Sequence, residues 1–133
     1  MSSPIADMLT IIRNALAAGR KEAVIPFSIM KTEISRILKE HDYIAGFEVI
    51  KDPVHKNTQS IKVTFKYISA KQPAISSLKI ISKPARRVYS TKDELPIVLN
   101  NIGIAIISTS QGIMTNNEAK KRKLGGEVVC EIY

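Results

Sequence analysis

The spacing of apolar residues switches between the helical and the strand period within the first 68 residues, and this pattern constrains the fold most. Apolar side chains recur three or four positions apart over residues 5–16 and 30–38, as in helices with one buried face. They alternate with polar side chains over residues 61–67, and shorter strand-like segments lie at 23–27 and 47–49. This half is therefore predicted as helix, strand, helix, strand, strand, with both helices on one face of a small sheet.

Capping residues mark the ends of the two predicted helices. Ser3 followed by Pro4 is typical of a helix start, and Gly19 is placed to end that helix in a left-handed conformation. Ser28 is the capping candidate for the second helix, whose buried stripe is predicted to begin at Met30.

The second half of the chain contains mainly strand-like segments. They lie at residues 75–82, 86–89, 102–107 and 127–132. Thr115–Glu118 forms a capping box for a helix that Gly125 and Gly126 are expected to end. A further short helix is expected to begin at Thr91 or at Pro96.

The best candidate linker is the short polar segment Lys71, Gln72 and Pro73, whose proline favours extended backbone. The predicted fold class is α+β, with two small α/β domains. The N-terminal domain covers residues 1–70 and has the order helix, strand, helix, strand, strand. The C-terminal domain covers residues 73–133 and is strand-rich, with one or two short helices.

Positive charge is concentrated in the middle of the chain. The formal net charge is +8, and residues 51–92 carry ten Lys and Arg against one acid, Asp52. A solvated face that keeps the protein soluble is one interpretation of such a segment. Clustering of the cations favours a polyanion such as a nucleic acid as the partner.

Residue types that other functional classes need are missing or badly placed. The single cysteine, Cys130, cannot form an internal disulfide, and its position in a strand predicts a small core residue. His41 and His55 have no metal-ligand partners nearby in sequence, and no phosphate-binding glycine loop is present. No membrane span or export signal is predicted. We expect a soluble binding protein of a reducing compartment, with no catalytic residues, metal or cofactor.

Three consecutive hydroxyl residues, Ser108, Thr109 and Ser110, follow the predicted buried strand and precede Gln111 and Gly112. Hydroxyls donate and accept hydrogen bonds, so they suit base edges, ribose hydroxyls and phosphate oxygens. Because they are uncharged, they would contribute selectivity rather than bulk affinity. From the residues alone, hydroxyls that merely satisfy the turn backbone remain the commoner arrangement.

Several short motifs occur in order along nearly the whole chain. The most specific is Ser-Thr-Ser-Gln-Gly-Ile-Met-Thr at 108–115, followed by Gly-Gly-Glu at 125–127. The others are Pro-Ile-Ala-Asp-Met-Leu-Thr at 4–10, Ser-Lys-Pro at 82–84 with Arg-Val-Tyr at 87–89, and Lys-Asp-Glu-Leu-Pro at 92–96. Together they resemble the bacterial-type small-subunit ribosomal proteins of the S-eight family.

The resemblance implies a structural protein that binds the central domain of small-subunit ribosomal RNA and supports its assembly. Neighbouring small-subunit ribosomal proteins are implied as partners. The implied location is the ribosome in the cytoplasm, with an organellar ribosome as the alternative. Members of the family often repress their own operon messenger as well. Neither a membrane nor a small-molecule substrate is implied.

Residues predicted to bind RNA fall into two groups. The cations Lys83, Arg86 and Arg87 are expected to contact phosphates. The family match adds Tyr89, Ser108, Thr109, Ser110, Gln111, Gly112, Gly125, Gly126 and Glu127 in the C-terminal domain, and Asp7, Thr10 and Asn14 in the N-terminal helix. The C-terminal domain is expected to dominate RNA contact.

Some positions depart from the family pattern or remain open. Ile11, Ala85 and Gln111 stand where arginine, glycine and lysine are common in the family. Tyr89 either stacks on a base or ribose or is a half-buried strand residue. The rival function is a protein-interaction module whose basic segment docks an acidic partner.

Overall fold

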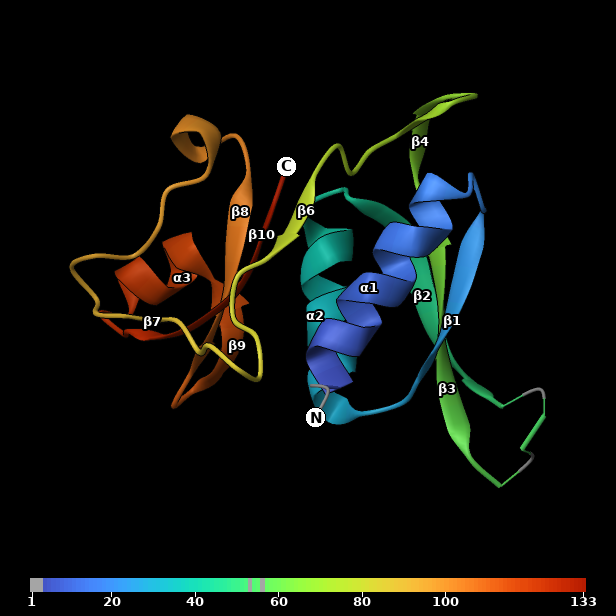
Figure 1. Cartoon of the computed structure of the whole chain (residues 1–133), viewed down its shortest axis with the longest axis horizontal. Helices are drawn as coiled ribbons and strands as arrows, with labels where there is room; N and C mark the ends of the chain where they lie inside the picture. The colour runs from blue at the N-terminus through green and yellow to red at the C-terminus, as the bar shows by residue number, and fades with distance from the viewer. Residues whose placement is uncertain (1–3, 53, 56) are drawn as a thin grey trace. The chain divides into compact units, whose positions relative to one another are not determined.

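The computed structural model describes residues 4–52, 54, 55 and 57–133 (Figure 1). Contacts between residues group them into two units, one formed by Asp7–Ile75 and the other by Ser76–Tyr133 together with residues 4–6. Each unit contains its own antiparallel sheet next to helical segments. The α+β fold class is therefore confirmed, whereas the predicted domain limits at residues 70 and 73 stay a prediction.

The unit Asp7–Ile75 is built around a three-stranded sheet. Its main elements are α1 (Pro4–Ala17), β1 (Glu22–Pro26), α2 (Ile29–Glu40), β2 (Ile44–Lys51) and β3 (Gln59–Phe65). The strand order is β1-β3-β2, with β3 antiparallel to both neighbours. Figure 1 shows α1 and α2 over the same face of this sheet, as the alternation of periods predicted.

Helix ends in this unit follow the capping residues. The Ser28 side chain accepts a hydrogen bond from the backbone N–H of Lys31 at 3.1 Å, so Ser28 caps α2 as predicted. Gly19 has a φ of +71°, the left-handed conformation that ends a helix and suits glycine. Ser3 lies outside the described residues, and α1 begins at Pro4.

The predicted buried stripe of α2 is wrong at its first position. Met30 is 45% exposed, whereas its neighbour Lys31 is only 7% exposed. The Lys31 ammonium donates a hydrogen bond to the carbonyl oxygen of Pro26 at 3.2 Å, which satisfies the charged end of this side chain. The first turn of α2 therefore turns its apolar Met30 towards solvent.

The expected linker is part of a small hairpin. Strands β4 (Tyr67–Ser69) and β5 (Gln72–Pro73) pair with each other, and Ala74 donates a backbone hydrogen bond to Lys66 at 2.8 Å. Pro73 tolerates this edge position because proline lacks the N–H that a central strand would need.

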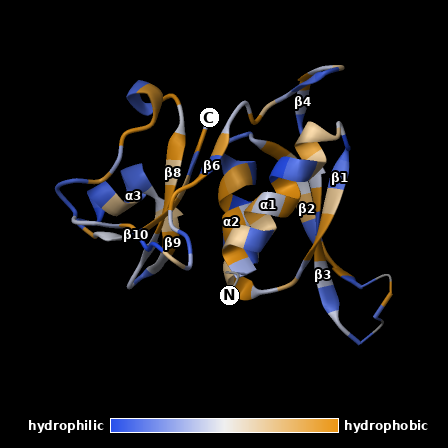
Figure 2. Cartoon of the chain, viewed as in Figure 1, coloured by the Kyte–Doolittle hydropathy of each residue, from blue (hydrophilic) through white to orange (hydrophobic). Residues whose placement is uncertain are grey.

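The unit that contains Ser76–Tyr133 is strand-rich. Its elements are β6 (Leu78–Ile80), β7 (Tyr89–Ser90), the short 3-10 segment η1 (Leu99–Asn101), β8 (Ile104–Thr109), β9 (Gly112–Thr115), α3 (Asn116–Lys121) and β10 (Gly126–Ile132). The sheet order is β6-β10-β8-β9, and the short β7 also pairs with β10. Apolar colour runs along β8, whereas α3 is largely polar (Figure 2).

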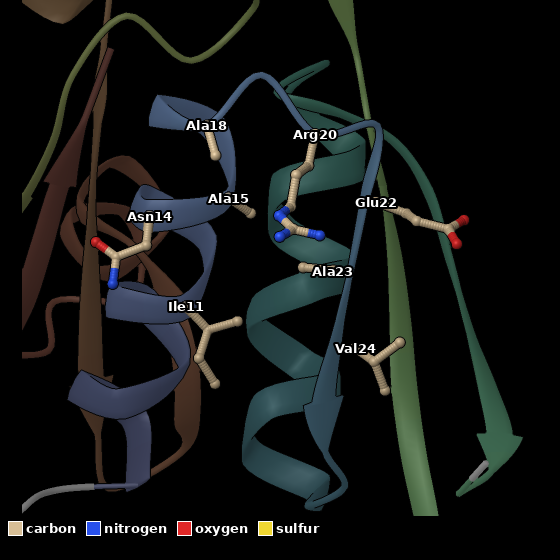
Figure 3. Close-up of a pocket in the computed structure, with 8 residues that line it drawn as sticks. All are labelled: Ile11, Asn14, Ala15, Ala18, Arg20, Glu22, Ala23 and Val24. Carbon is tan, nitrogen blue, oxygen red and sulfur yellow. The ribbon is translucent and has the colours of Figure 1, made fainter.

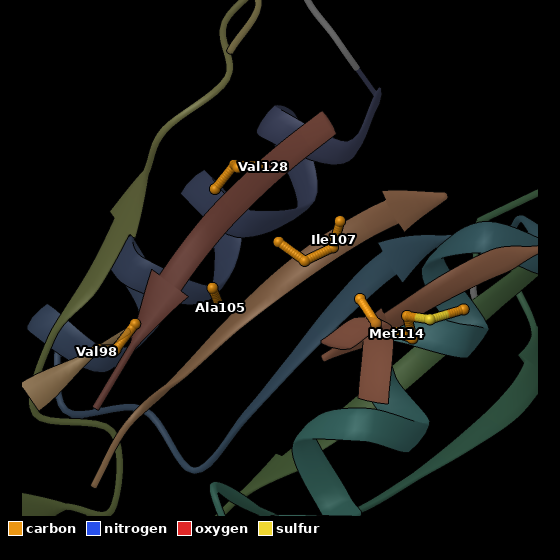
Figure 4. Close-up of a cluster of buried hydrophobic side chains, with 6 residues drawn as sticks. Val98, Ala105, Ile107, Met114 and Val128 are labelled. Carbon is orange, nitrogen blue, oxygen red and sulfur yellow. The ribbon is translucent and has the colours of Figure 1, made fainter. Parts of the chain in front are cut away.

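One apolar cluster joins the strands of this sheet to α3. Its buried members are Val98, Ala105, Ile107, Met114, Ala119 and Val128 (Figure 4). Thr115 accepts a hydrogen bond from the backbone N–H of Glu118 at 3.2 Å, so the predicted cap of α3 is confirmed. Cys130 is completely buried, as its position in the terminal strand predicted.

Two local predictions in this unit are wrong. Residues 91–94 form a turn rather than a helix start, and the chain after Pro96 contains three consecutive left-handed residues. Their φ angles are 45° at Leu99, 51° at Asn100 and 70° at Asn101, which excludes a regular right-handed helix there. The helix α3 also ends at Lys121, before the glycine pair that was expected to terminate it.

Candidate nucleic-acid interface

Three residues predicted to bind RNA lie side by side on neighbouring strands. Tyr89 on β7 is the Cα partner of Glu127 on β10, and Glu127 is the Cα partner of Ser108 on β8. Directly paired residues place their side chains on the same face of a sheet. The fold therefore brings together on one face an aromatic, an acid and a hydroxyl that are far apart in sequence.

Tyr89 is available to a ligand in this arrangement. Its relative exposure is 71%, so the alternative of a half-buried strand tyrosine is wrong. An exposed ring has a free face on which a base or ribose can stack.

The glycine pair allows strand β10 to approach its neighbours closely. A Cβ atom on Gly126 would overlap the backbone of Ser108, and one on Gly125 would overlap the carbonyl oxygen of Ser90. Both neighbours are backbone atoms, which cannot move aside as a flexible side chain can. Gly125 and Gly126 are therefore required by strand packing at the site, and do not end a helix as was expected.

The hydroxyl segment is a tight hairpin rather than an open loop. Ser108 and Thr109 belong to β8, and Gly112 begins β9 with a φ of +113° that favours glycine. Only Ser110 and Gln111 form the turn, and both are exposed. Two paired strands therefore hold the hydroxyls in place.

The three hydroxyls have different local partners. Thr109 donates to the carbonyl oxygen of Gly112 at 2.8 Å and accepts from the backbone N–H of Gln111 at 3.1 Å. Within the described residues, the hydroxyls of Ser108 and Ser110 make no hydrogen bond. Thr109 thus shapes the turn, as the commoner arrangement predicted, whereas the donors and acceptors of the Ser108 and Ser110 hydroxyls are not used within the described residues.

The proline turn presents two unpaired cations. Lys83 and Arg86 exchange both backbone hydrogen bonds, at 3.0 and 2.9 Å, which closes a tight turn around Pro84. Both residues are exposed, and neither forms an ion pair within the part of the chain that the structure describes. These charges are free to meet phosphate oxygens.

Arg87 differs from the other two cations because it is already paired. Its guanidinium Nη1 donates to Oε2 of Glu127 at 3.0 Å, and the same oxygen accepts from the hydroxyl of Ser82 at 2.5 Å. Sequence reasoning did not select Ser82. The only signal was its place beside Lys83 and Pro84 in a family motif, because a serine at the end of a predicted strand has no distinctive pattern.

The remaining predicted residues, Asp7, Thr10 and Asn14, lie on α1 in the other unit. Their spacing of three and four positions places them on one side of the helix, where Asp7 and Asn14 are exposed. Asn14 also lines a shallow hollow between α1 and β1, beside Arg20 (Figure 3). These residues form a separate small polar surface on their own unit.

The side chains of the site are hydroxyls, an aromatic ring, an amide and cations, which can hydrogen-bond, stack and pair with charge. Among the described residues, no group of three or more His, Cys, Asp or Glu could hold a metal ion. No helix in the described part of the chain is long and apolar enough to cross a membrane. Residues 95–117 carry no formal charge, so the hydrogen-bonding groups of Ser108, Thr109 and Ser110 lie in an uncharged segment.

Comparison with known proteins gives one consistent result. The family model described as "Ribosomal protein S8" matches residues 3–133. The small ribosomal subunit protein uS8 of Caldicellulosiruptor bescii is 53% identical over 130 residues, which cover 98% of this chain and 96% of that protein. Its counterpart in Thermodesulfovibrio yellowstonii is 47% identical over 133 residues, which cover 100% of this chain and 99% of that protein.

Proposed function

The chain belongs to the ribosomal protein S8 family, and we propose that it binds the central domain of small-subunit ribosomal RNA through the sheet of its C-terminal unit. The family consists of structural, non-enzymatic proteins, so this chain is a constituent of the small ribosomal subunit. Its place is the ribosome in the cytoplasm. Ribosomal RNA and neighbouring ribosomal proteins are its partners.

The observation that carries the proposal is the alignment of Tyr89, Glu127 and Ser108 across strands β7, β10 and β8. Each of them belongs to one of the family motifs in the sequence. An exposed aromatic ring beside unpaired hydroxyls suits unstacked bases and ribose groups of structured RNA. This chemistry supports sequence-selective contact better than mere attraction of a polyanion.

The proposed binding combines phosphate contacts, which supply affinity, with base or ribose contacts, which supply selectivity. Lys83 and Arg86 position the phosphate backbone, and their contribution falls as salt is raised, because counterions compete. Ser108 and Ser110 read base edges or ribose hydroxyls, and their contribution does not depend on charge. Gln111 offers an amide donor and acceptor at the tip of the same turn.

The N-terminal unit has a smaller role in the proposal. Asp7, Thr10 and Asn14 contribute secondary contacts from α1, and the limits 1–70 and 73–133 divide the chain into a supporting and a recognising domain. A second RNA that presents the same structure, such as the operon messenger, would bind at the same C-terminal site. Repression of that messenger then follows from competition for one surface.

Binding measurements on the full chain test this proposal. The RNA probes are a central-domain fragment of small-subunit ribosomal RNA and an unrelated duplex of the same length, and an acidic peptide represents the rival class of partner. We expect tight binding to the fragment and weak binding to the duplex at physiological salt. Equal affinity for both RNAs, or preference for the acidic peptide, would contradict the proposal.

Sedimentation of ribosomal particles provides the second measurement. The chain should remain with small subunits after a wash in high salt, because its selective contacts do not rely on charge. Release of the chain at moderate salt, while other small-subunit proteins stay bound, would indicate loose electrostatic association instead.

A further inference from the structure

One oxygen of the Glu127 carboxylate accepts two hydrogen bonds from other side chains of the protein. Oε2 accepts one hydrogen bond from Ser82 at 2.5 Å and another from Arg87 at 3.0 Å. The Glu127 side chain is 21% exposed, whereas that of Arg87 is 47% exposed. The acid is therefore the inner partner of the pair, and the guanidinium is the outer one.

Ser82 connects this ion pair to the strand that carries Tyr89. Ser82 is only 8% exposed, and its hydroxyl accepts a hydrogen bond from the backbone N–H of Val88 at 3.1 Å. Val88 in turn accepts a backbone hydrogen bond from Val128 at 2.8 Å. A displaced Glu127 carboxylate would leave the buried hydroxyl of Ser82 without its acceptor. The Glu127 carboxylate, the Ser82 hydroxyl and the backbone N–H of Val88 therefore hold one another in place.

An acid at a surface that faces RNA needs a physical reason. A free carboxylate repels phosphates, and Glu127 is the only acidic side chain among the residues predicted to bind RNA in this unit. Because its charge is matched by Arg87, the pair is close to neutral towards a distant polyanion. The ion pair therefore reduces the attraction of Arg87 for phosphates in general and holds its guanidinium at Glu127, the Cα partner of Tyr89.

We propose that Glu127 is a positioning residue that sets RNA specificity by holding Arg87, with Ser82 as the buried support of the carboxylate. This inference rests on the proposed function, because it assumes that the C-terminal sheet binds RNA. Held in this way, Arg87 adds a donor of fixed geometry for the cognate RNA. Released, it becomes one more mobile charge that binds any phosphate.

The test compares Glu127→Gln with the unaltered chain, using the central-domain fragment and the unrelated duplex as probes. Glutamine keeps the size of the side chain and removes the charge that retains Arg87. Affinity for the duplex should rise severalfold at low salt, and the logarithmic salt slope should steepen by about 0.7–0.9, the effect of one additional phosphate contact. Affinity for the fragment should fall roughly three- to tenfold relative to the duplex.

Glu131→Gln is the matched control. Glu131 lies on the same strand, and the substitution removes one negative charge without releasing a cation, because Glu131 forms no ion pair within the described residues. Its salt slope should match that of the unaltered chain. If Glu131→Gln steepened the slope as much as Glu127→Gln, the effect would be one of net charge, and the proposal would be overturned.

A double substitution separates action through Arg87 from direct contact with RNA. In an Arg87→Gln background, Glu127→Gln should leave the salt slope unchanged, because no guanidinium remains to be released. If Glu127→Gln lowered affinity for the fragment equally in both backgrounds, Glu127 would touch the RNA itself, and the proposal would be overturned.

Ser82 provides an independent arm that leaves both charges in place. Ser82→Ala should change specificity in the same direction as Glu127→Gln, and Ser82→Thr, which restores a hydroxyl, should recover most of it. Thermal unfolding of each variant shows whether it is folded. Specificity that follows stability alone across these variants would overturn the positioning role, whereas failure of the unaltered chain to prefer the fragment would overturn the proposed function as well.

Discussion

Gly126 and Ser108 are so close across strands β10 and β8 that a Cβ atom on the glycine would overlap the carbonyl oxygen of the serine. Glu127 is the next residue, so the same backbone contact also fixes the position from which its side chain reaches Ser82 and Arg87. The glycine thus links the geometry of the hydroxyl hairpin to that of the ion pair. This relationship makes the backbone at Gly126 a determinant of the whole site.

Gly126→Ala should therefore destabilise the protein and weaken selective RNA binding together. Relief of the overlap requires a backbone shift, which costs about 1–3 kcal/mol in the free energy of unfolding. Thermal unfolding and affinity for the central-domain fragment measure the two effects. Gly46→Ala is the control, because a Cβ there would meet no atom within 4 Å, and it should change stability by less than about 0.5 kcal/mol.

Ser110→Ala should separate affinity from stability. The side chain of Ser110 is exposed, and its hydroxyl forms no hydrogen bond within the described residues. Removal of this hydroxyl should therefore change the free energy of unfolding by less than about 0.5 kcal/mol. Selective affinity should fall by about 1–3 kcal/mol, the cost of leaving a polar RNA group unpaired, while affinity for an unrelated duplex stays constant.

The neighbouring hydroxyl serves as the control for that substitution. Thr109→Ala removes two hydrogen bonds that shape the turn, so stability and selective affinity should fall together. If Ser110→Ala behaved like Thr109→Ala, or if it lowered affinity for both RNAs alike, the hydroxyl of Ser110 would not be a selective contact.

The spacing of apolar residues predicted most of the helices and strands, because an element that buries one face must place apolar side chains at its own structural period. The order of helices and strands in the first unit, the caps at Ser28 and Thr115, and the buried strand around Ile106 all follow from local pattern. The sequence pattern did not predict strand β9 or the left-handed turn at Leu99. The first is too short to show a period, and the second runs against the preference of its own residues.

The site was predicted only in part, and for a physical reason. The motif residues Tyr89, Ser108 and Glu127 could be selected by resemblance, but their alignment depends on strand register between distant segments. Ser82 and the pairing of Arg87 depend on the same register. Sequence patterns carry no signal for side chains that meet across a sheet from segments 40 residues or more apart.

The free cations of the proline turn should determine the salt dependence of binding. Replacing Lys83 and Arg86 together by Gln should reduce the logarithmic salt slope by about 0.7–0.9 for each lost phosphate contact. The control replaces Lys62 and Lys66, whose ammonium groups lie 3.4 Å from Glu48 and 3.7 Å from Asp42 respectively. An equal reduction in that control would place the phosphate contacts outside the proline turn.

Burial of Cys130 should make the stability of the protein sensitive to alkaline pH. Burial raises the pKa of its thiol from 9.0 to about 12, so the folded state holds the proton more tightly than the unfolded chain. The resulting stabilisation is complete below pH 9 and declines as the pH rises towards 12. Between pH 9 and pH 10.5 the thiol should account for a loss of about 2 kcal/mol.

Urea unfolding of the protein and of Cys130→Ala at several pH values measures this loss. The alanine variant starts from a lower stability because it leaves a small cavity, but its decline above pH 9 should be shallower. Parallel declines of the two proteins would show that other groups dominate the alkaline range, such as the half-buried Tyr43, whose pKa is raised by burial.

A fragment that begins at Pro73 should retain recognisable RNA specificity. It keeps the apolar cluster around Ile107 and Val128, together with every predicted contact residue of the C-terminal unit. The start of the fragment is also bonded to its end, since the carbonyl oxygen of Tyr133 accepts backbone hydrogen bonds from Ser76 at 2.7 Å and from Ser77 at 2.8 Å.

Circular dichroism and a cooperative melting curve establish that the fragment folds. Its preference for the central-domain fragment over the unrelated duplex is then compared with that of the full chain. We expect the preference to persist with lower overall affinity, because the contacts predicted on α1 are missing. Complete loss of the preference in a folded fragment would show that recognition requires the N-terminal unit as well.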